Sequence, residues 1–343
     1  SSAASDVYKR QVLQFGDHGG AIGTLIGQEN RGLETMFIMM NAARFAVGIQ
    51  GISVAERAYQ KAVAYAKDRV QSKDLEGSPT AVSIIHQPDV RRMLMSMRAQ
   101  IEAARALAYV GAAAFDLAHH HPDEKVRGEQ QAFYEFLVPV IKGWSTEMSI
   151  DVASTGLQIH GGMGFIEETG AAQYYRDARI LTIYEGTTAI QANDLVGRKT
   201  VRDGGVVARG IIAAVRGTEA ELAKAAAPDL QAIGAHLAAA STALEEVVAY
   251  VVANIQSDIK GVFAGSVPYL KLAGIVLCGW QMGRAALIAQ AKLDAGSGDA
   301  KFYQAKIATA RFFADYFLSQ AGAYRSAIVD GSAGVLALDE AQF

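Results

Sequence analysis

The stretch from residue 32 to residue 69 reads GLETMFIMMNAARFAVGIQGISVAERAYQKAVAYAKDR. Apolar residues recur in it at steps of three and four positions, namely Leu33, Met36, Phe37, Met40, Ala43, Val47 and Val54. This spacing places them on one face of an α-helix, because an α-helix has 3.6 residues per turn. At 1.5 Å per residue, roughly 36 residues of this stretch form a helix about 54 Å long. We therefore expect a long bundle helix with one buried face.

Further helical runs follow along the chain. A second helix is expected over about 88–119, where Pro88 occupies a favourable first-turn position. A third is expected over about 131–159, with a kink at Pro139 because proline cannot donate the helical hydrogen bond. A short helix at about 166–179 precedes a fourth bundle helix that opens near residues 186–188. Long helices joined by short connections predict an antiparallel four-helix bundle.

A second helical domain is expected after the glycine-rich break Asp203-Gly204-Gly205. Helical runs recur there at about 206–225, 229–258, 267–294 and 300–328. The fold class predicted for the chain is therefore all-α. The domains are a four-helix bundle over residues 32–200, a second helical domain over 201–330 and a tail over 331–343.

The N-terminal segment does not continue this pattern. Residues 1–11 carry no apolar periodicity, and we interpret them as a non-native leader. Residues 12–31 alternate weakly around a glycine-rich turn, which predicts a β-hairpin left over from a middle β-domain. The sequence is thus expected to be a piece of a longer protein.

The composition excludes several classes of protein. The 343 residues are 51% hydrophobic with a net charge of −3, which is unlike a disordered chain. The single cysteine, Cys278, excludes an internal disulfide and fits a reducing, cytoplasmic location in a bacterium. The near-neutral charge predicts no nucleic-acid partner. The longest uncharged apolar run, Leu272 to Trp280, is too short to span a bilayer.

One carboxylate is a candidate general base. Glu185 follows the apolar segment 180–184 and precedes Gly186, so it lies at a helix entrance beside hydrophobic surface. Such surroundings make a carboxylate more basic, and Gly186 allows a ligand to approach the backbone closely. The alternative on spacing alone is a glutamate that caps a helix of the bundle.

This stretch resembles the C-terminal signature of the acyl-CoA dehydrogenase family, through Arg176-Asp177-Ala178-Arg179 and Ile183-Tyr184-Glu185-Gly186-Thr187. The segment QIHGGMG at residues 158–164 is similar to the flavin-binding segment of the family, 27 residues before Glu185. Arg69-Val70-Gln71 resembles its Arg-x-Gln element, and Arg44 stands 25 residues earlier. Ala189 departs from the pattern, since many members carry a polar residue there. The region 201–328 resembles the extra helical domain of a larger subgroup, which includes 3-methylmercaptopropionyl-CoA and long-chain acyl-CoA dehydrogenases.

The resemblance implies an FAD enzyme that oxidises an acyl-CoA thioester to the trans-2-enoyl-CoA. Glu185 is implied to be the base that removes the α-proton, while a hydride passes from the β-carbon to flavin N5. The implied flavin-binding residues are Arg69 and Gln71, which reach across a dimer interface, together with Gln158, Gly161, Gly162 and Thr187. The implied substrate-binding residues are Asn41, Arg44 and Gly186.

The resemblance also implies partners. These are an electron-transfer flavoprotein and a second copy of the chain, in a homodimer or a dimer of dimers. An acyl-CoA oxidase of the same fold is one alternative function. A DNA-binding alkylation-response flavoprotein is another, although residues 201–343 carry 12 Lys and Arg against 13 Asp and Glu. The chain by itself is expected to bind flavin weakly and to turn over poorly.

The tract His119-His120-His121 is the only motif suggestive of a metal. It precedes Pro122 at a helix end and has no second group of ligands nearby in the sequence, so a solvated turn is expected and no metal site is predicted.

Overall fold

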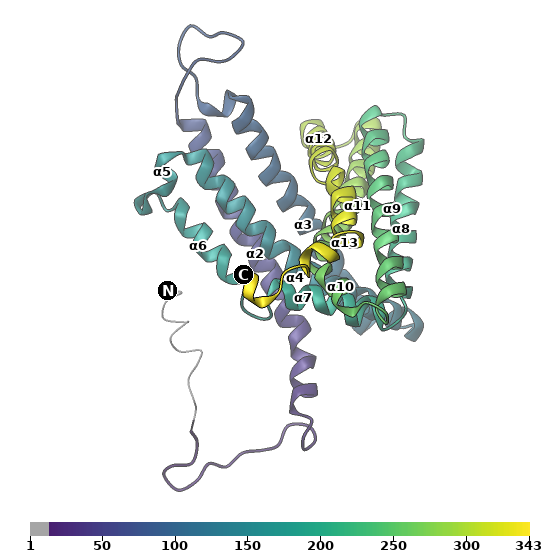
Figure 1. The fold of residues 1–343 in the computed structure, drawn as a ribbon. Coiled ribbons are helices and arrows are strands. Elements are labelled where there is room, and N and C mark those ends of the chain that lie inside the picture. The colour runs from purple at the N-terminus through teal and green to yellow at the C-terminus, as the bar shows by residue number, and fades with distance from the viewer. Residues whose placement is uncertain (1–13) are drawn as a thin grey trace. The chain divides into compact units, whose positions relative to one another are not determined.

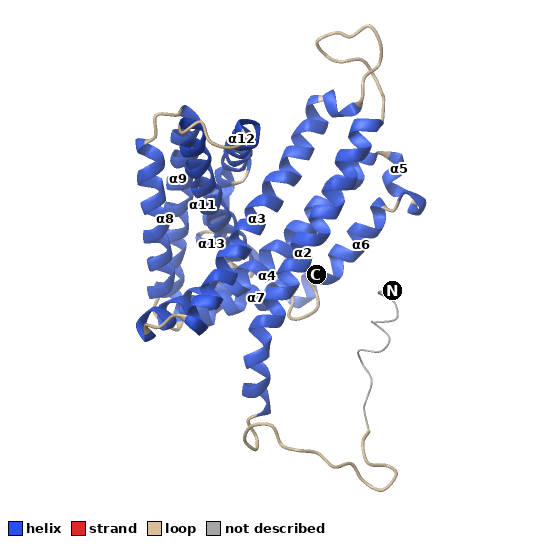
Figure 2. Ribbon diagram, turned by 180° about the vertical axis from the view of Figure 1, so that it is seen from behind, coloured by secondary structure: helices blue, strands red, loops and turns tan. Residues whose placement is uncertain are grey.

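The computed structural model describes residues 14–343, except for the side chains of Glu34, Phe37 and Ile38. The described chain divides into two units, with the boundary between Ala43 and Arg44. Across residues 14–343 the chain forms helices, turns and loops with no strand, which confirms the all-α prediction (Figure 2). The predicted leader at residues 1–11 lies outside the described residues.

The predicted hairpin does not form in residues 14–31. This segment contains turns and extended chain, and every residue of it is exposed. Gly20 N donates to Gly16 O at 3.2 Å, so a turn is present without flanking strands. An isolated two-stranded hairpin with no sheet or helix to pack on is marginal in water, which explains the difference. Residues 12 and 13 of the predicted hairpin lie outside the described residues.

The helical bundle is built around one long helix, α4, which contacts α3, α6 and α7 (Figure 1). Its α-helices are α2 (Gly32–Asp68), α3 (Pro88–His120), α4 (Glu124–His160), α5 (Gly162–Phe165), α6 (Ala171–Leu181) and α7 (Thr188–Val196). Short helical turns η1 (Ile84–His86), η2 (Glu167–Thr169) and η3 (Gly197–Val201) connect or extend them.

The connection between α3 and α4 is shorter than the sequence predicts. The predicted helices end at about 119 and begin again at about 131, yet α3 continues to His120 and α4 already begins at Glu124. Asp123 caps α4 by accepting a hydrogen bond from Lys125 N at 2.9 Å, which satisfies a backbone donor at the start of the helix. The helix then runs through Pro139 without ending.

The fourth position of the bundle is shared by two helices. Both α6 and α7 pack on α4, and the chain between them forms the turn at residues 182–187. The interruption replaces the single helix that would complete a regular bundle. It places Glu185 in a turn between two helix ends.

The C-terminal helices pack around α11, which contacts α8, α9, α12 and α13. The helices of this region are α8 (Val206–Lys224), α9 (Pro228–Asn254), α10 (Ile259–Ala264), α11 (Ser266–Asp294), α12 (Ala300–Tyr316), η4 (Leu318–Gln320), α13 (Ala321–Val329), α14 (Ser332–Val335) and η5 (Glu340–Gln342). The helix α11 also contacts α3, α4 and α7, and one hydrophobic core extends through both sets of helices.

Two of the described helices, Pro228–Asn254 and Ser266–Asp294, are long and apolar enough by length and composition to cross a membrane. This differs from the sequence analysis, which considers only uncharged runs. In Ser266–Asp294 the apolar window is 78% buried within the fold. Such burial is typical of the core helix of a helical protein, and α11 has that place here.

Candidate functional site

The turn between α6 and α7 carries the predicted base. Glu185 has a φ of 55° and Gly186 a φ of 88°, so two consecutive residues adopt the left-handed conformation. The side chain of Glu185 is exposed, as is that of Thr187. Thr187 is the N-cap of α7, where its Oγ1 accepts a hydrogen bond from Ile190 N at 3.3 Å. The turn therefore presents the Glu185 carboxylate to the outside of the bundle.

The carbonyl groups of this turn point toward buried donors. Lys142 Nζ donates to Gly186 O at 2.5 Å. Gln191 Nε2 donates to Gly186 O at 3.3 Å and to Glu185 O at 3.4 Å. Both donors have side chains in residues that are 0% exposed. The backbone of the candidate base is thus held from beneath, while its carboxylate remains accessible.

Lys142 is unusual among the charged residues of the bundle. It lies in the apolar run Leu137–Trp144 of α4 and is fully buried. Burial lowers the pKa of Lys142 to about 8, and the positive charge of Arg44 lowers it further, against weaker opposing effects of Glu147 and Glu185. Neither Lys142 nor Gln191 is among the residues predicted for the site. The signal that points to Lys142 in the sequence is a lysine within a run of apolar residues.

Arg44, predicted to face the CoA, is buried in an ion pair. Its Nη1 donates to Asp194 Oδ2 at 3.0 Å, and each of the two residues is 5% exposed. Arg198 Nε lies 3.4 Å from the other carboxylate oxygen of Asp194. The Arg44 guanidinium therefore faces α7 inside the fold. Asn41, three residues earlier in α2, is half-buried and belongs to the first unit.

A second group of predicted residues lines one groove. The groove has an empty volume of about 630 Å³ and contains all five residues of the two flavin-type motifs. These residues are Arg69, Gln71, Gln158, Gly161 and Gly162; the other lining residues are Tyr65, Ile84, Ile159, His160 and Met163. Residues 87 or more positions apart in the sequence, such as Gln71 and Gln158, thus meet at one surface.

The Arg69–Gln71 side of the groove is shaped by a short backbone pairing. Ile84 N donates to Arg69 O at 2.8 Å, and Gln71 N donates to Val82 O at 3.0 Å. An isolated antiparallel bridge joins Val70 and Ser83. Arg69 Nη2 donates to Gln71 Oε1 at 3.4 Å, so the two side chains lie together on the groove.

The glycine side of the groove is open. At Gly161, the C-cap of α4, φ is 59° and ψ is −140°, a conformation that is essentially restricted to glycine. A Cβ atom added at Gly161 or Gly162 would meet no atom within 4 Å. The groove therefore offers bare backbone, a guanidinium and two amides, a donor set suited to the pyrophosphate of a dinucleotide such as FAD.

Tyr65 and His160 support this groove and are not predicted as site residues. Their rings stack with centroids 4.4 Å apart, and His160 Nδ1 donates to Gly156 O at 2.7 Å. Burial lowers the pKa of His160, with a smaller contribution from Lys61 and an opposing one from the Gly156 hydrogen bond. A neutral imidazole is thus favoured behind Gly161.

The predicted residues therefore fall into two places. The groove lining contains neither Glu185 nor Thr187, which lie at the turn before α7. Gly186 belongs to the turn as well. A Cβ added there would lie 2.7 Å from Gln191 Nε2 and 3.2 Å from Ile190 Cγ2, so these side chains would have to shift.

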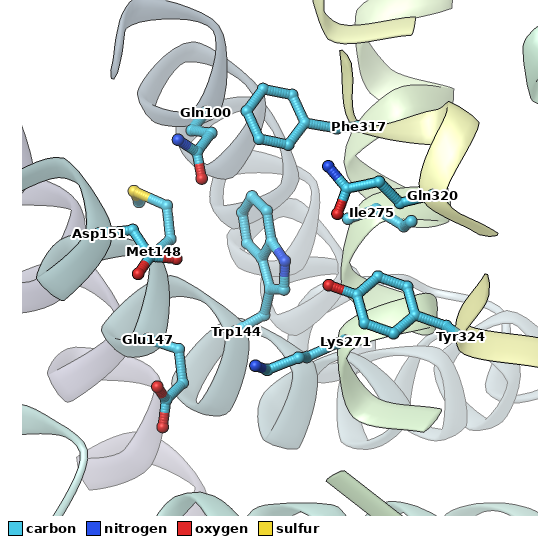
Figure 3. A pocket seen from close by; sticks show the side chains of 10 residues that line it. All are labelled: Gln100, Trp144, Glu147, Met148, Asp151, Lys271, Ile275, Phe317, Gln320 and Tyr324. Atoms are coloured by element: carbon cyan, nitrogen blue, oxygen red, sulfur yellow. The ribbon is translucent and has the colours of Figure 1, made fainter. Parts of the chain in front are cut away.

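A polar cavity lies on the side of α4 that faces the C-terminal helices (Figure 3). Its charged residues are Glu147, Asp151 and Lys271, and Trp144 and Tyr324 also line it. Burial raises the pKa of Asp151. Lys271 lowers this pKa and Glu147 raises it, each to a smaller extent than burial. Glu147 also accepts a hydrogen bond from Thr188 Oγ1, which links α4 to the first residue of α7.

No group of three or more His, Cys, Asp or Glu residues arranged to hold a metal is found among residues 14–343. In the histidine tract, His119 Nδ1 donates to Phe115 O at 2.8 Å, and the ring lies 4.1 Å from that of Phe115.

Two protein families match successive parts of the chain. Residues 30–199 match the family described as "Acyl-CoA dehydrogenase, C-terminal domain". Residues 211–339 match the family described as "Acetyl-CoA dehydrogenase C-terminal like". The first match includes both the turn at Glu185 and the groove.

Two curated relatives are named as acyl-CoA dehydrogenases. The chain is 54% identical over 315 residues to 3-methylmercaptopropionyl-CoA dehydrogenase of Ruegeria pomeroyi, covering 92% of this chain and 53% of the relative. It is 37% identical over 351 residues to the broad-specificity linear acyl-CoA dehydrogenase FadE5 of Mycobacterium tuberculosis, covering 96% of this chain and 56% of that protein. The chain thus spans about half the length of the curated relatives it matches.

Solved structures share the fold. An acyl-CoA dehydrogenase complexed with FAD from Bacillus anthracis superposes with a TM-score of 0.70 at 18% identity, over 92% of this chain and 52% of that one. ACDH-11 of Caenorhabditis elegans in complex with C11-CoA gives 0.67 at 19% identity, over 91% and 50%. Acyl-CoA oxidase 1 of Arabidopsis thaliana gives 0.59 at 12% identity, over 90% and 51%. The family matches and the curated relatives show that the chain belongs to the acyl-CoA dehydrogenase family.

Proposed function

We propose that the protein to which this chain belongs is an FAD-dependent acyl-CoA dehydrogenase in which Glu185 is the base. The observation that carries this proposal is the turn at residues 185–186. It holds the backbone of Glu185 on two buried donors and leaves the carboxylate exposed. A carboxylate on a backbone held in this way can accept the proton that the thioester acidifies on the α-carbon of the acyl group.

The residues of the groove would hold the FAD. Arg69 can bind two phosphate oxygens through its planar fork, and the bare backbone at Gly161 and Gly162 allows the phosphates close to N–H donors. Gln71 and Gln158 add amide groups to the same surface. FAD, when bound, supplies the acceptor for the hydride that leaves the β-carbon. Thr187 is proposed to contact the flavin from the turn.

The separation of the two groups supports a cofactor shared between copies. Five flavin residues line the groove, while Glu185 and Thr187 lie outside it. We propose that the groove of one copy binds part of the FAD whose reactive ring lies at the Glu185 turn of a second copy, in a homodimer or a dimer of dimers. An electron-transfer flavoprotein is the proposed electron acceptor. One relative, 30% identical over 166 residues, is named caffeyl-CoA reductase-Etf complex subunit CarC.

The substrate is proposed to be an acyl-CoA thioester. The names of the relatives suggest two thioesters to test, 3-methylmercaptopropionyl-CoA and a linear acyl-CoA. Gly186 is proposed to face the acyl group, and Asn41 to face the CoA. Since the Arg44 guanidinium is paired with Asp194, we propose that it acts by holding α7 rather than by binding CoA. A cytoplasmic location remains a proposal from the sequence.

The experiment that tests this function compares wild-type and Glu185→Gln full-length protein. Glutamine keeps the size of the side chain but cannot accept the α-proton. We expect the variant to keep its bound flavin and to lose acyl-CoA-dependent dye reduction by about 10²-fold or more. Glu167→Gln, on the exposed turn η2, is the matched control and should leave the rate unchanged. Equal turnover by Glu185→Gln and wild type would refute the assignment of the base. Reoxidation of the reduced enzyme by oxygen at the rate given by an electron-transfer flavoprotein would favour an oxidase.

A further inference from the structure

The backbone at Glu185 is in an unfavourable conformation. A left-handed φ costs a non-glycine residue roughly 1–2 kcal/mol, and glutamate has no side-chain feature that lowers this cost. Such a conformation persists only where surrounding contacts favour it. The contacts that favour it here are made to the carbonyl groups of Glu185 and Gly186.

Lys142 makes the shortest of these contacts. Its ammonium donates to Gly186 O at 2.5 Å, whereas the Gln191 amide lies 3.3 Å or more from either carbonyl. No ion pair joins Lys142 to a carboxylate of the described residues. The Gly186 carbonyl, one residue beyond the proposed base, is therefore the polar partner of this buried ammonium.

A lysine in this place is costly for the fold. An ammonium without a paired carboxylate is expensive to bury, and an apolar side chain of the same length would fill the same space in α4. The charged groups that act on Lys142 are Arg44 from α2, Glu147 on its own helix and Glu185 at the turn. Arg44 repels the ammonium, and the two carboxylates attract it. Burial and the repulsion by Arg44 therefore disfavour a charged lysine at position 142, and the hydrogen bond to Gly186 O favours it.

We propose that Lys142 is a positioning residue for the Glu185 base, and that it acts by donating from the buried face of α4 to the Gly186 carbonyl. This inference rests on the proposed dehydrogenase function. Without the ammonium, the turn is held only by the longer contacts of Gln191. The Glu185 carboxylate then samples positions from which it cannot reach the α-proton, so proton abstraction slows while acyl-CoA still binds.

The test is Lys142→Met in the full-length protein, because methionine keeps the length of the side chain and removes the donor. We expect kcat to fall about 10- to 100-fold, with KM for the acyl-CoA and the flavin content changed less than about twofold. Exchange of the substrate α-proton with D2O should slow by the same factor as kcat. Lys199→Met is the matched control, since it removes a different mostly buried ammonium, one that pairs with Glu135 at 2.9 Å. It should leave both rates unchanged.

The pH profile gives a readout that a purely structural role would not change. In the wild type, the rate should fall as pH rises through about 8, because a neutral amine is a weaker donor to Gly186 O. In Lys142→Met this decline should be absent. If Lys142→Met does not accumulate with flavin, Lys142→Gln replaces it, since the shorter amide stays polar but cannot keep the 2.5 Å contact.

The outcomes separate this inference from the proposed function. Active wild-type protein together with a fully active Lys142→Met or Lys142→Gln variant would overturn the positioning role and leave the function standing. Wild-type protein with bound flavin but no reaction with any acyl-CoA tested would overturn the function itself, and the positioning role with it. A parallel loss of kcat and α-proton exchange, without a change in KM, supports the role of Lys142.

Discussion

Lys142 on α4 and Gly186 in the turn before α7 are joined by a hydrogen bond of 2.5 Å, although they lie 44 positions apart in the sequence. The contact places a buried positive charge directly beneath the residue that follows the candidate base. It links α4 to the interruption between α6 and α7. The stability of this fold and the placement of Glu185 are therefore coupled through one side chain.

Lys142 should make the stability of the protein depend on pH. Burial lowers its pKa from 10.5 to about 8, so between these values the unfolded chain binds more protons than the folded one. The folded state of the wild type therefore gains stability as pH rises from about 8 to 10.5, by up to roughly 3 kcal/mol relative to Lys142→Met. Thermal melting of both proteins at pH 7 and pH 10 measures this. A melting-temperature difference that does not change between the two pH values contradicts the prediction.

The buried pair Arg44–Asp194 should be sensitive to loss of one partner. The two side chains are 6% and 4% exposed, so the Arg44 guanidinium left without Asp194 is poorly solvated. We expect Asp194→Leu to destabilise the folded protein by about 3–5 kcal/mol, and the double variant Arg44→Met/Asp194→Leu by less. Chemical denaturation of the single and double variants gives the coupling energy. Additive effects of the two substitutions would show that the ions do not act as a pair.

Gly162 should be needed for the flavin and not for the fold. A Cβ added there meets no atom of the protein within 4 Å, so Gly162→Val has space in the folded chain. In the proposed site this space belongs to the cofactor, and we expect FAD affinity to fall about 10- to 100-fold through steric exclusion of the phosphates. Fluorescence titration of the apoprotein with FAD measures the loss. Gly217→Val, at an equally open position in α8, serves as the control and should bind FAD normally.

A cofactor shared between two copies predicts complementation between variants. Glu185→Gln lacks the base, and the variant Arg69→Gln/Gln71→Ala lacks part of the groove. In a hybrid dimer, one site receives both defects and the other receives neither. Random mixing of the unfolded or dissociated variants should therefore restore about a quarter of the wild-type activity, from half-active hybrids that form half of the dimers. A mixture as inactive as its components would show that each copy holds its own FAD.

Much of the fold can be predicted from short-range patterns. The apolar stripe of residues 32–69 predicts α2, and Pro88 marks the start of α3. The break at 203–205 falls between η3 and α8. The hairpin predicted for residues 12–31 is wrong over residues 14–31, because that segment has no sheet on which such strands could pack. The predicted gap between the second and third helices is too long, since Asp123 caps α4 and lets it begin at Glu124.

The residues of the candidate site also differ in whether the sequence alone identifies them. Glu185, Gln158, Gly161 and Arg69 can be found in the sequence, because their chemistry lies in local motifs. Lys142 cannot be assigned to the turn in this way, since nothing in the run LVPVIKGW indicates which carbonyl its ammonium meets. The burial of Arg44 against Asp194, 150 positions away, is equally invisible in the sequence.

Periodicity predicts the helical class, and the motifs predict the family and, through the resemblance, a candidate base and candidate flavin-binding residues, because both are local properties of the chain. The three-dimensional arrangement adds that five of the predicted flavin-binding residues line one groove, that the candidate base lies outside it and that Lys142 donates to the turn from the buried side. These relationships depend on how α4 packs against α2, α6 and α7. Packing of this kind sets which distant groups meet in a buried, poorly solvated space.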